Sequence, residues 1–240
     1  MKNSLAAAND ERYRGHINLC EIDLSGQKAI TEARVLIAGA GGLGSPVALY
    51  LAAAGVGTIG IADADTVSLS NLQRQIMHGM PDVGLPKVES AARAMKRINP
   101  DVDVEIHNVF LSHDNAAAII ERYDVVADCT DRFATRLLVS DVCRELGKPM
   151  VHAAVERFRG QLFTQTPGSS TFRDIFGTEE RQTDECGCAA TGILNTVVGV
   201  AGSLQATEVI KIIAGTGEVL VNRLLTFDTL TMSFDVFNLG

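Results

Sequence analysis

Short apolar runs alternate with longer helical segments over the first two thirds of the chain. Continuous apolar runs of this length are typical of strands that are buried on both faces of a parallel sheet. We expect strands at 34–39, 58–63, 102–107, 124–128 and 149–154, and helices that begin at Gly44, at Pro86, near Asn115 and at Phe133. The alternation therefore predicts consecutive βαβ units.

The pattern changes after residue 154. Three further strand-like runs, at 156–166, 220–227 and 231–237, have only one helix between them, at 192–214. They indicate antiparallel additions to the same sheet. Residues 167–191 show no clear period, and we expect a mobile crossover loop there, over the active site. The chain is thus predicted to form one domain, 1–240, with a doubly wound, Rossmann-like α/β fold.

A glycine-rich loop, Gly39-Ala-Gly-Gly-Leu-Gly44, lies between the first strand and an Ala-rich helix. Its glycines are Gly39, Gly41, Gly42 and Gly44. They let a phosphate approach the amide groups at the helix start, where the helix dipole favours negative charge. Asp63 closes the next strand, at the usual spacing for a carboxylate that binds ribose hydroxyls. This context predicts an adenine-nucleotide site; the alternative is that the glycines serve only helix–strand packing.

Two cations follow the ribose carboxylate, Arg74 and Lys87. A hydride-transfer cofactor needs few cations, whereas a phosphorus centre under attack needs its charge neutralised. Asp131 follows the strand at 124–128, where it could hold Mg²⁺ with phosphate oxygens. The alternatives are that Arg74 and Lys87 are solvated surface cations and that Asp131 is a helix N-cap.

Several motifs resemble the MoeB/ThiF/HesA adenylyltransferases, the bacterial relatives of ubiquitin-activating enzymes. They lie at 39–45, 53–57, 69–75, 83–90, 128–131, 199–206 and 227–231, so the resemblance covers nearly the whole chain. It implies that ATP and Mg²⁺ are bound by the positions matching Gly42, Asp63, Asn71, Arg74, Lys87 and Asp131. It also implies a substrate, the C-terminal glycine carboxylate of a small ubiquitin-fold sulfur-carrier protein ending in Gly-Gly, in thiamin or molybdopterin biosynthesis.

This reaction is consistent with the residue types. A carboxylate is already ionised at neutral pH, so its attack on the α-phosphate needs no general base. It needs two anions to be aligned and the charge of the transition state to be relieved. Arg74 and Lys87 would act on the phosphates and Asp131 through Mg²⁺, while Asp63 would hold the ribose. Asn71 could donate to a phosphate oxygen.

The chain departs from the family pattern in three places. Many members bind structural zinc with two CxxC pairs, but Thr171 and Asp174 stand where the first pair would be. Cys186 and Cys188 are the only closely spaced cysteines, so we expect no zinc. Arg132 stands where Asn is usual, and it either adds a phosphate contact or points to water. Gly15 replaces an arginine used across the dimer, a role that leaves Arg14 as a candidate.

Cys188 lies in a Cys-x-x-x-Gly segment that resembles the one in which some members carry a cysteine for sulfur transfer. The alternatives are a small apolar filler or a redox partner of Cys186. We expect Cys20, Cys129 and Cys143 to lie in the core.

Composition supports this class of protein. The net charge of −8 argues against nucleic acid as a partner, and five cysteines without framework spacing suggest a reducing, cytoplasmic setting. No apolar stretch follows the N-terminus, which argues against a signal peptide. The apolar stretch 192–214 carries polar and charged residues, so it predicts a buried helix rather than a membrane span. A homodimer is expected from the resemblance and from an apolar N-terminal stretch with no place in the sheet, formed by Tyr13, Ile17, Leu19 and Ile22.

Two other functions remain open. A Rossmann oxidoreductase that uses NAD would leave Arg74 and Lys87 unexplained. A non-catalytic dimeric scaffold that binds the carrier would keep the fold without turnover.

Overall fold

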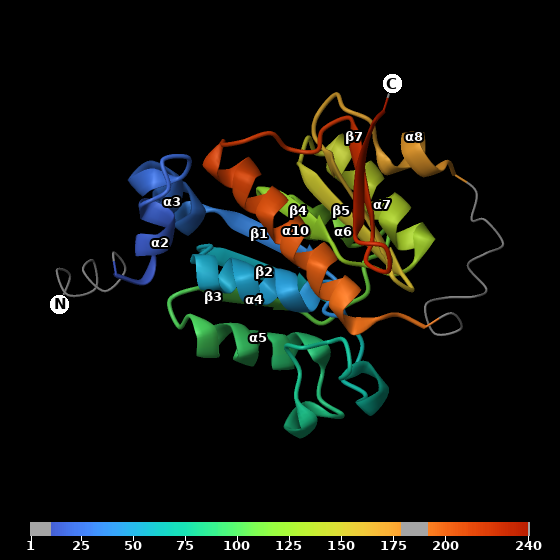
Figure 1. Cartoon of the computed structure of the whole chain (residues 1–240). Coiled ribbons are helices and arrows are strands. Elements are labelled where there is room, and N and C mark those ends of the chain that lie inside the picture. The colour runs from blue at the N-terminus through green and yellow to red at the C-terminus, as the bar shows by residue number, and fades with distance from the viewer. Residues whose placement is uncertain (1–10, 179–191, 240) are drawn as a thin grey trace.

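The structure is a computed structural model that describes residues 11–178 and 192–239. Within those residues, eight strands form one sheet in the order β3-β2-β1-β4-β5-β6-β7-β8 (Figure 1). The strands are β1 (Arg34–Ala38), β2 (Thr58–Ala62), β3 (Asp103–His107), β4 (Val125–Asp128), β5 (Met150–Glu156), β6 (Arg159–Gln165), β7 (Arg223–Asp228) and β8 (Ser233–Asn238). The first five are parallel and the last three are antiparallel. The predicted doubly wound sheet with antiparallel C-terminal strands is confirmed.

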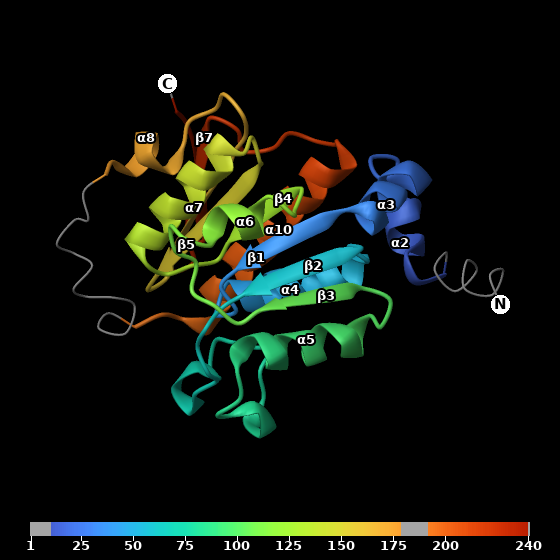
Figure 2. The same ribbon diagram turned by 180° about the vertical axis from the view of Figure 1, so that it is seen from behind.

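Helices cover both faces of this sheet. They are α2 (Arg14–Ile17), α3 (Asp23–Glu32), α4 (Gly44–Ala54), α5 (Lys87–Ile98), α6 (Ala116–Ile120), α7 (Phe133–Glu145), α8 (Phe172–Phe176) and α10 (Asn195–Ala214). Short 3₁₀ turns lie at η1 (Leu69–Asn71) and η2 (Met80–Asp82). Figure 1 shows α4 and α10 on one face, and Figure 2 shows α6 and α7 on the other.

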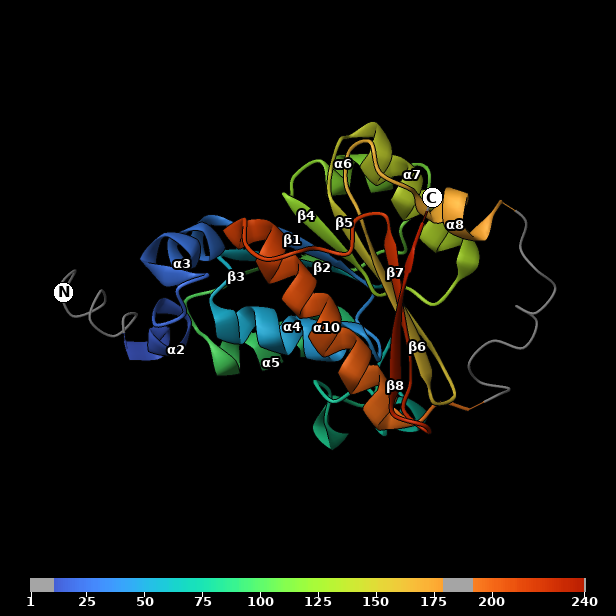
Figure 3. The same cartoon turned by 45° about the horizontal axis from the view of Figure 1, so that its top comes forward.

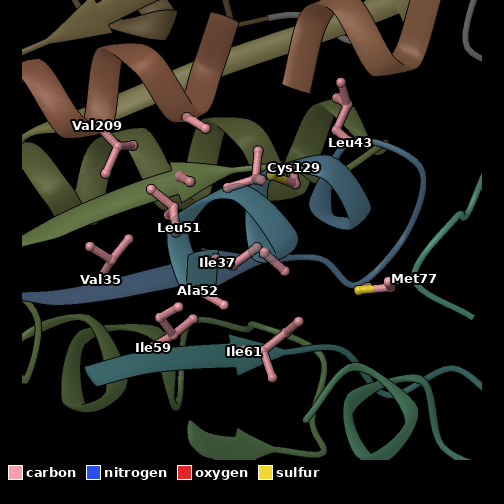
Figure 4. Packing of buried hydrophobic residues seen from close by; sticks show 14 of the residues in the cluster. Val35, Ile37, Leu43, Leu51, Ala52, Ile59, Ile61, Met77, Cys129 and Val209 are labelled. Atoms are coloured by element: carbon pink, nitrogen blue, oxygen red, sulfur yellow. The ribbon is translucent and has the colours of Figure 1, made fainter. Parts of the chain in front are cut away.

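Two apolar clusters join the helices to the sheet, because successive side chains of a strand point to opposite faces. Val35 and Ile37 of β1 pack in the cluster that contains α4, α5 and α10, whereas Leu36 packs in the cluster that contains α6, α7 and α8. Figure 4 shows Val35, Ile37, Ile59 and Ile61 lined up in the first cluster. The inner strands β1, β2 and β4 are thus buried on both sides, as their continuous apolar sequences predicted, whereas the edge strand β3 is partly exposed.

Helix α10 crosses the sheet beside α4 (Figure 3). It is long and apolar enough to span a membrane by length and composition. Gln205, near its middle, is buried and donates 2.8 Å hydrogen bonds to the carbonyl oxygens of Asp128 in β4 and Val151 in β5. The prediction of a buried helix is therefore confirmed.

Part of the segment expected as a crossover loop is helical. Residues 172–176 form α8, which begins at a capping box made by Thr171 and Asp174. Phe172 is buried in the second cluster, where its ring lies 5.2 Å from Phe133 and 4.7 Å from Phe176. A five-residue helix is too short to show a period, so pattern analysis could not find it. Residues 179–191 lie outside the described part of the chain.

One N-terminal expectation also needs correction. Tyr13 lies outside the sheet, as expected, but it is buried against the end of α4, and its hydroxyl accepts a 2.8 Å hydrogen bond from Asn99 Nδ2. Cys20 is exposed, unlike Cys129 and Cys143, which lie in the core as expected.

Candidate functional site

A cavity of about 310 Å³ lies at the carboxyl ends of β1 to β4. The direction of the strand order reverses between β1 and β4, and open α/β sheets bind their ligands at such a switch point. The volume is within the range of small-molecule sites. The polar and charged lining residues are Asp63, Asp65, Arg74, Gln75, Lys87, Thr130, Asp131, Arg132, Thr135 and Arg136.

The glycine loop forms one wall of the cavity. Gly39, Gly41 and Gly42 line it, whereas Gly44 does not. Gly39 has a φ of 103°, a backbone conformation that other residues rarely adopt, and a Cβ there would lie 2.8 Å from the Cys129 carbonyl oxygen. A Cβ on Gly44 would lie 2.0 Å from the Gly39 carbonyl oxygen. Gly44 therefore serves the tight turn into α4, and the other three glycines border the ligand space.

Asp63 follows β2 and is held by the backbone around it. Its Oδ2 accepts a 2.8 Å hydrogen bond from the Ala40 amide, and its Oδ1 accepts one of 2.8 Å from the Asp65 amide. These bonds orient the carboxylate on the cavity wall beside the glycine loop. This is the place that the βαβ geometry predicts for a ribose-binding carboxylate.

Lys87 is the first residue of α5 and is only 6% exposed. Its Nζ lies 2.7 Å from Asp65 Oδ2 and 4.0 Å from Asp63 Oδ2. A buried lysine requires such partners because desolvation of its charge is costly. The structure thus overturns the alternative of a solvated surface cation for Lys87.

Arg74 and Arg132 are two further cations of the cavity wall. Arg74 is half-buried, and its Nη1 donates to the Ser70 carbonyl oxygen at 3.3 Å. The Arg132 guanidinium stacks over the Phe110 ring, 5.9 Å from its centroid. Both arginines line the same cavity as Lys87, so all three cations could contact a phosphate bound there.

Asp131 is exposed on the cavity wall, one residue before Arg132, the N-cap of α7. Asp131 is therefore not the cap that the alternative interpretation required. Within the described residues, no hydrogen bond or ion pair reaches its carboxylate. The Asp131 carboxylate thus has no hydrogen-bond or ion-pair partner among the described residues, on a wall that it shares with four cations.

A buried pair supports the loop that carries Asp131. Asp128 Oδ2 accepts a 2.7 Å hydrogen bond from His152 Nδ1, and both side chains are fully buried. Burial lowers the pKa of His152. Burial also acts to raise the pKa of Asp128, but hydrogen bonds from His152 and Thr130 outweigh it and lower that pKa. A neutral histidine thus donates to a carboxylate, and this carboxylate orients Thr130 at the start of the loop.

Two expected site residues are not brought to the cavity. Asn71 does not line it; the Asn71 carbonyl oxygen instead accepts from the amides of Arg74 and Gln75, which closes the turn that presents Arg74. Cys188 lies outside the described residues, and so does Cys186.

The lining residues that the sequence interpretation missed include Gln75, Phe110 and Arg136. Gln75 is buried inside a motif that had been singled out for its neighbour Arg74. Phe110 follows β3 and is 58% exposed, and its position after a parallel strand was the available signal. Arg136 lies one turn into α7 and donates from Nε and Nη2 to the Thr130 carbonyl oxygen, a contact that depends on the fold.

Comparison with known proteins agrees with this geometry. A model of the ThiF family matches residues 13–240. The chain is 42% identical over 232 residues to the SAMP-activating enzyme E1 of Haloferax volcanii, covering 97% of this chain and 86% of that protein. It is 43% identical over 228 residues to the probable adenylyltransferase/sulfurtransferase MoeZ of Mycobacterium tuberculosis, covering 93% of this chain and 58% of MoeZ.

Solved structures share the fold. Escherichia coli MccB, solved with ATP, superposes with a TM-score of 0.80 at 24% identity, over 90% of this chain and 67% of MccB. PaaA superposes with a TM-score of 0.81 at 20% identity, over 97% of this chain and 74% of PaaA. With the family match over most of its length, the chain belongs to the ThiF family, as its motifs predicted.

Proposed function

We propose that this protein uses ATP to adenylylate the C-terminal glycine carboxylate of a small ubiquitin-like sulfur-carrier protein, and releases pyrophosphate. The observation that carries the proposal is one cavity in which the glycine loop, the Asp63 carboxylate and four cations meet. The names of the relatives, an adenylyltransferase/sulfurtransferase and a SAMP-activating E1, support the same reaction class. The oxidoreductase alternative has no relative among those described above.

In the proposed step, a carboxylate oxygen of the carrier forms a bond to the α-phosphorus, and the bond from that phosphorus to the bridging β-phosphate oxygen breaks. The carrier's carboxylate is ionised at neutral pH, so no side chain needs to remove a proton. Lys87 and Arg74 reduce the repulsion between the carboxylate and the triphosphate. Lys87 must exchange its Asp65 partner for a phosphate oxygen, and Asp65 keeps the ammonium in place until then.

Mg²⁺ is the metal that this reaction class implies, and the donor set fits it. Mg²⁺ is bound through one or two carboxylates together with phosphate oxygens and water, and it rarely occupies a cage made only of protein. Among the described residues no group of three or more His, Cys, Asp or Glu side chains could hold a metal, while the Asp131 carboxylate is unpaired on the cavity wall. Asp131 would hold the ion, which would neutralise charge on the phosphates.

The finer parts of the proposal concern pathway and assembly. We propose that the product serves sulfur transfer in molybdopterin- or thiamin-type cofactor synthesis in the cytoplasm, and that the protein acts as a homodimer. Arg14, exposed at the start of α2, remains the candidate for a contact across that dimer. We propose a sulfur-transfer role for Cys188, in which Cys188→Ala would keep pyrophosphate exchange and abolish thiocarboxylate formation on the carrier.

The test is ATP–pyrophosphate exchange with each small Gly-Gly protein of the source organism. Exchange should need Mg²⁺ and a carrier, and amidation of the carrier's C-terminal carboxylate should abolish it. A protein that binds ATP yet shows no exchange with any such carrier would contradict the enzyme and favour the scaffold. Binding of NAD(H) without binding of ATP would favour the oxidoreductase.

A further inference from the structure

His78 connects three parts of the nucleotide cavity without lining it. It is buried at the end of the segment that carries Arg74. Its Nε2 lies 3.0 Å from the carbonyl oxygen of Ala40 in the glycine loop. Its Nδ1 lies 2.8 Å from the hydroxyl of Ser90, one turn into α5 from Lys87.

The partners define which ring nitrogen carries the proton. A carbonyl oxygen can only accept, so Nε2 donates to Ala40 and Nδ1 accepts from the Ser90 hydroxyl. Burial lowers the pKa of His78, so the neutral ring that this arrangement needs is the favoured form. The ring therefore links the glycine loop to α5 through one hydrogen bond at each ring nitrogen.

The bond to Ala40 also determines the direction of the next amide. The Ala40–Gly41 peptide is trans, as are all peptide bonds in the described residues, so the Gly41 N–H points opposite to the Ala40 carbonyl and away from His78. Gly41 lines the cavity, and its N–H donates to no other described residue. On the other side of Ala40, the amide is held by Asp63 at 2.8 Å.

We propose that His78 is a positioning residue that holds the Gly41 N–H in the direction required to donate to a phosphate of the bound nucleotide. The inference rests on the proposed function, because it requires ATP in this cavity. Asp63 binds the Ala40 amide and His78 binds the Ala40 carbonyl oxygen, so the conformation of the loop is fixed before the nucleotide binds. Such preorganised donors bind developing or fixed negative charge without the cost of reorganisation.

Two substitutions separate the hydrogen bond to Ala40 from the hydrogen bond to Ser90. His78→Gln keeps an N–H at about the distance of Nε2, and so keeps the donor to Ala40. In His78→Asn, the amide group of the shorter side chain lies at about the position of Nδ1. It keeps a hydrogen-bond partner for the Ser90 hydroxyl and leaves the Ala40 carbonyl oxygen without a donor. Both variants lose one buried hydrogen bond, so their melting temperatures should fall by similar amounts.

The readout is calorimetric binding of ATP and of adenosine, which lacks the phosphates. We expect His78→Asn to weaken ATP binding about tenfold and His78→Gln less than threefold, with adenosine binding changed less than threefold in both. In pyrophosphate exchange, His78→Asn should raise the KM for ATP and leave the KM for the carrier unchanged. Equal loss of ATP and adenosine, or unchanged ATP binding in His78→Asn, would overturn the inference and leave only a structural role.

A measurement on the wild-type protein covers the case in which a variant fails to fold. In a ¹⁵N–¹H titration, the Gly41 amide resonance should shift with ATP and not with adenosine, and its failure to shift with ATP would overturn the inference. Absence of ATP binding by the wild-type protein would overturn the proposed function as well. Absence of carrier-dependent exchange, with the ATP results as expected, would contradict the proposed function alone.

Discussion

At the scale of single residues, the site depends on charges that are paired before any substrate arrives. Lys87 is almost completely buried, and Asp65 and Asp63 compensate its charge. Because the two carboxylates are close to each other, removal of the lysine leaves them to repel any phosphate. Arg74, held through the Ser70 carbonyl oxygen, has no carboxylate partner among the described residues and is available to an anion at once.

Lys87→Ala and Arg74→Ala should therefore each lower kcat/KM for pyrophosphate exchange about 10²–10³-fold, since each removes a cation from a phosphate under attack. Lys96→Ala, which removes an exposed lysine on the same helix, α5, is the matched control and should change exchange less than twofold. Steady-state exchange with ATP and carrier varied measures both. A loss below threefold for Lys87→Ala would place the phosphates elsewhere.

Substitutions of the two site carboxylates should have different effects: loss of Asp63 should weaken ATP binding, and loss of Asp131 should change the dependence on Mg²⁺. Asp63→Ala should raise the Kd for ATP in calorimetry by about tenfold, because it loses both the proposed ribose contact and the acceptor of the Ala40 amide. Asp131→Asn should instead raise the Mg²⁺ concentration needed for half-maximal exchange, because its carboxylate has no protein partner among the described residues and is proposed to hold the metal. Identical Mg²⁺ curves for the wild type and Asp131→Asn would remove Asp131 from the metal site.

At the scale of elements, α8 is held by its cap and by its neighbour α7. Thr171 and Asp174, the positions at which the family resemblance implied cysteines, cap the helix: Asp174 Oδ2 accepts from the Thr171 amide at 2.8 Å and from its hydroxyl at 2.7 Å. The Phe172 amide is bound by Ser140 Oγ at 3.1 Å, which attaches α8 to α7. That the chain binds no zinc stays a prediction, which elemental analysis of the purified protein tests.

Thr171→Val keeps the volume of the side chain and removes the capping hydroxyl. It should lower the free energy of unfolding in urea by about 1 kcal/mol, while Thr171→Ser, which keeps the hydroxyl, should lower it less. Ser170→Ala is the neighbouring control, because the hydrogen bonds of Ser170 in this structure come from its backbone. Equal destabilisation by the Val and Ser variants would point to packing rather than to the cap.

At the scale of the whole molecule, buried histidines should make stability depend on pH. Burial lowers the pKa of His78, His107 and His152, so the folded protein takes up protons at these sites less readily than the unfolded chain. The unfolded value is about 6.5. Stability is therefore greatest above that pH and falls as the pH drops towards the lowered pKa values.

The melting temperature should fall between pH 7 and pH 5, and His107→Gln should reduce the slope. Glutamine retains an N–H donor for the Tyr123 hydroxyl but does not titrate in this range. His113→Gln, at an exposed position, is the control. A melting temperature that is constant or rises on acidification would contradict the expected sign.

A homodimer is the other expectation for the whole molecule. Leu19, in the apolar N-terminal stretch, is 48% exposed, and Leu24, which follows that stretch, is 65% exposed. Burial of such side chains between two copies would be favourable. Light scattering at micromolar concentration should give the mass of two chains, and a mass of one chain would contradict the dimer.

The sequence by itself determined what depends on short range. Short apolar runs specified the strands to within a few residues, because an inner strand of a parallel sheet must be apolar on both faces over its whole length. The glycine loop and Asp63 specified the nucleotide end of the sheet, because βαβ topology places residues that follow consecutive strands at one edge.

Only the tertiary structure decided which distant groups pair. The Tyr13 hydroxyl meets Asn99, 86 residues away, and His78 meets Ala40, 38 residues away. No periodicity records such contacts, since they depend on strand order and on which helix face reaches the loop. The same holds for Lys87, which the sequence left between a surface cation and a phosphate ligand. Its burial beside Asp65 follows from how α5 begins at the sheet edge, where desolvation requires a charged partner.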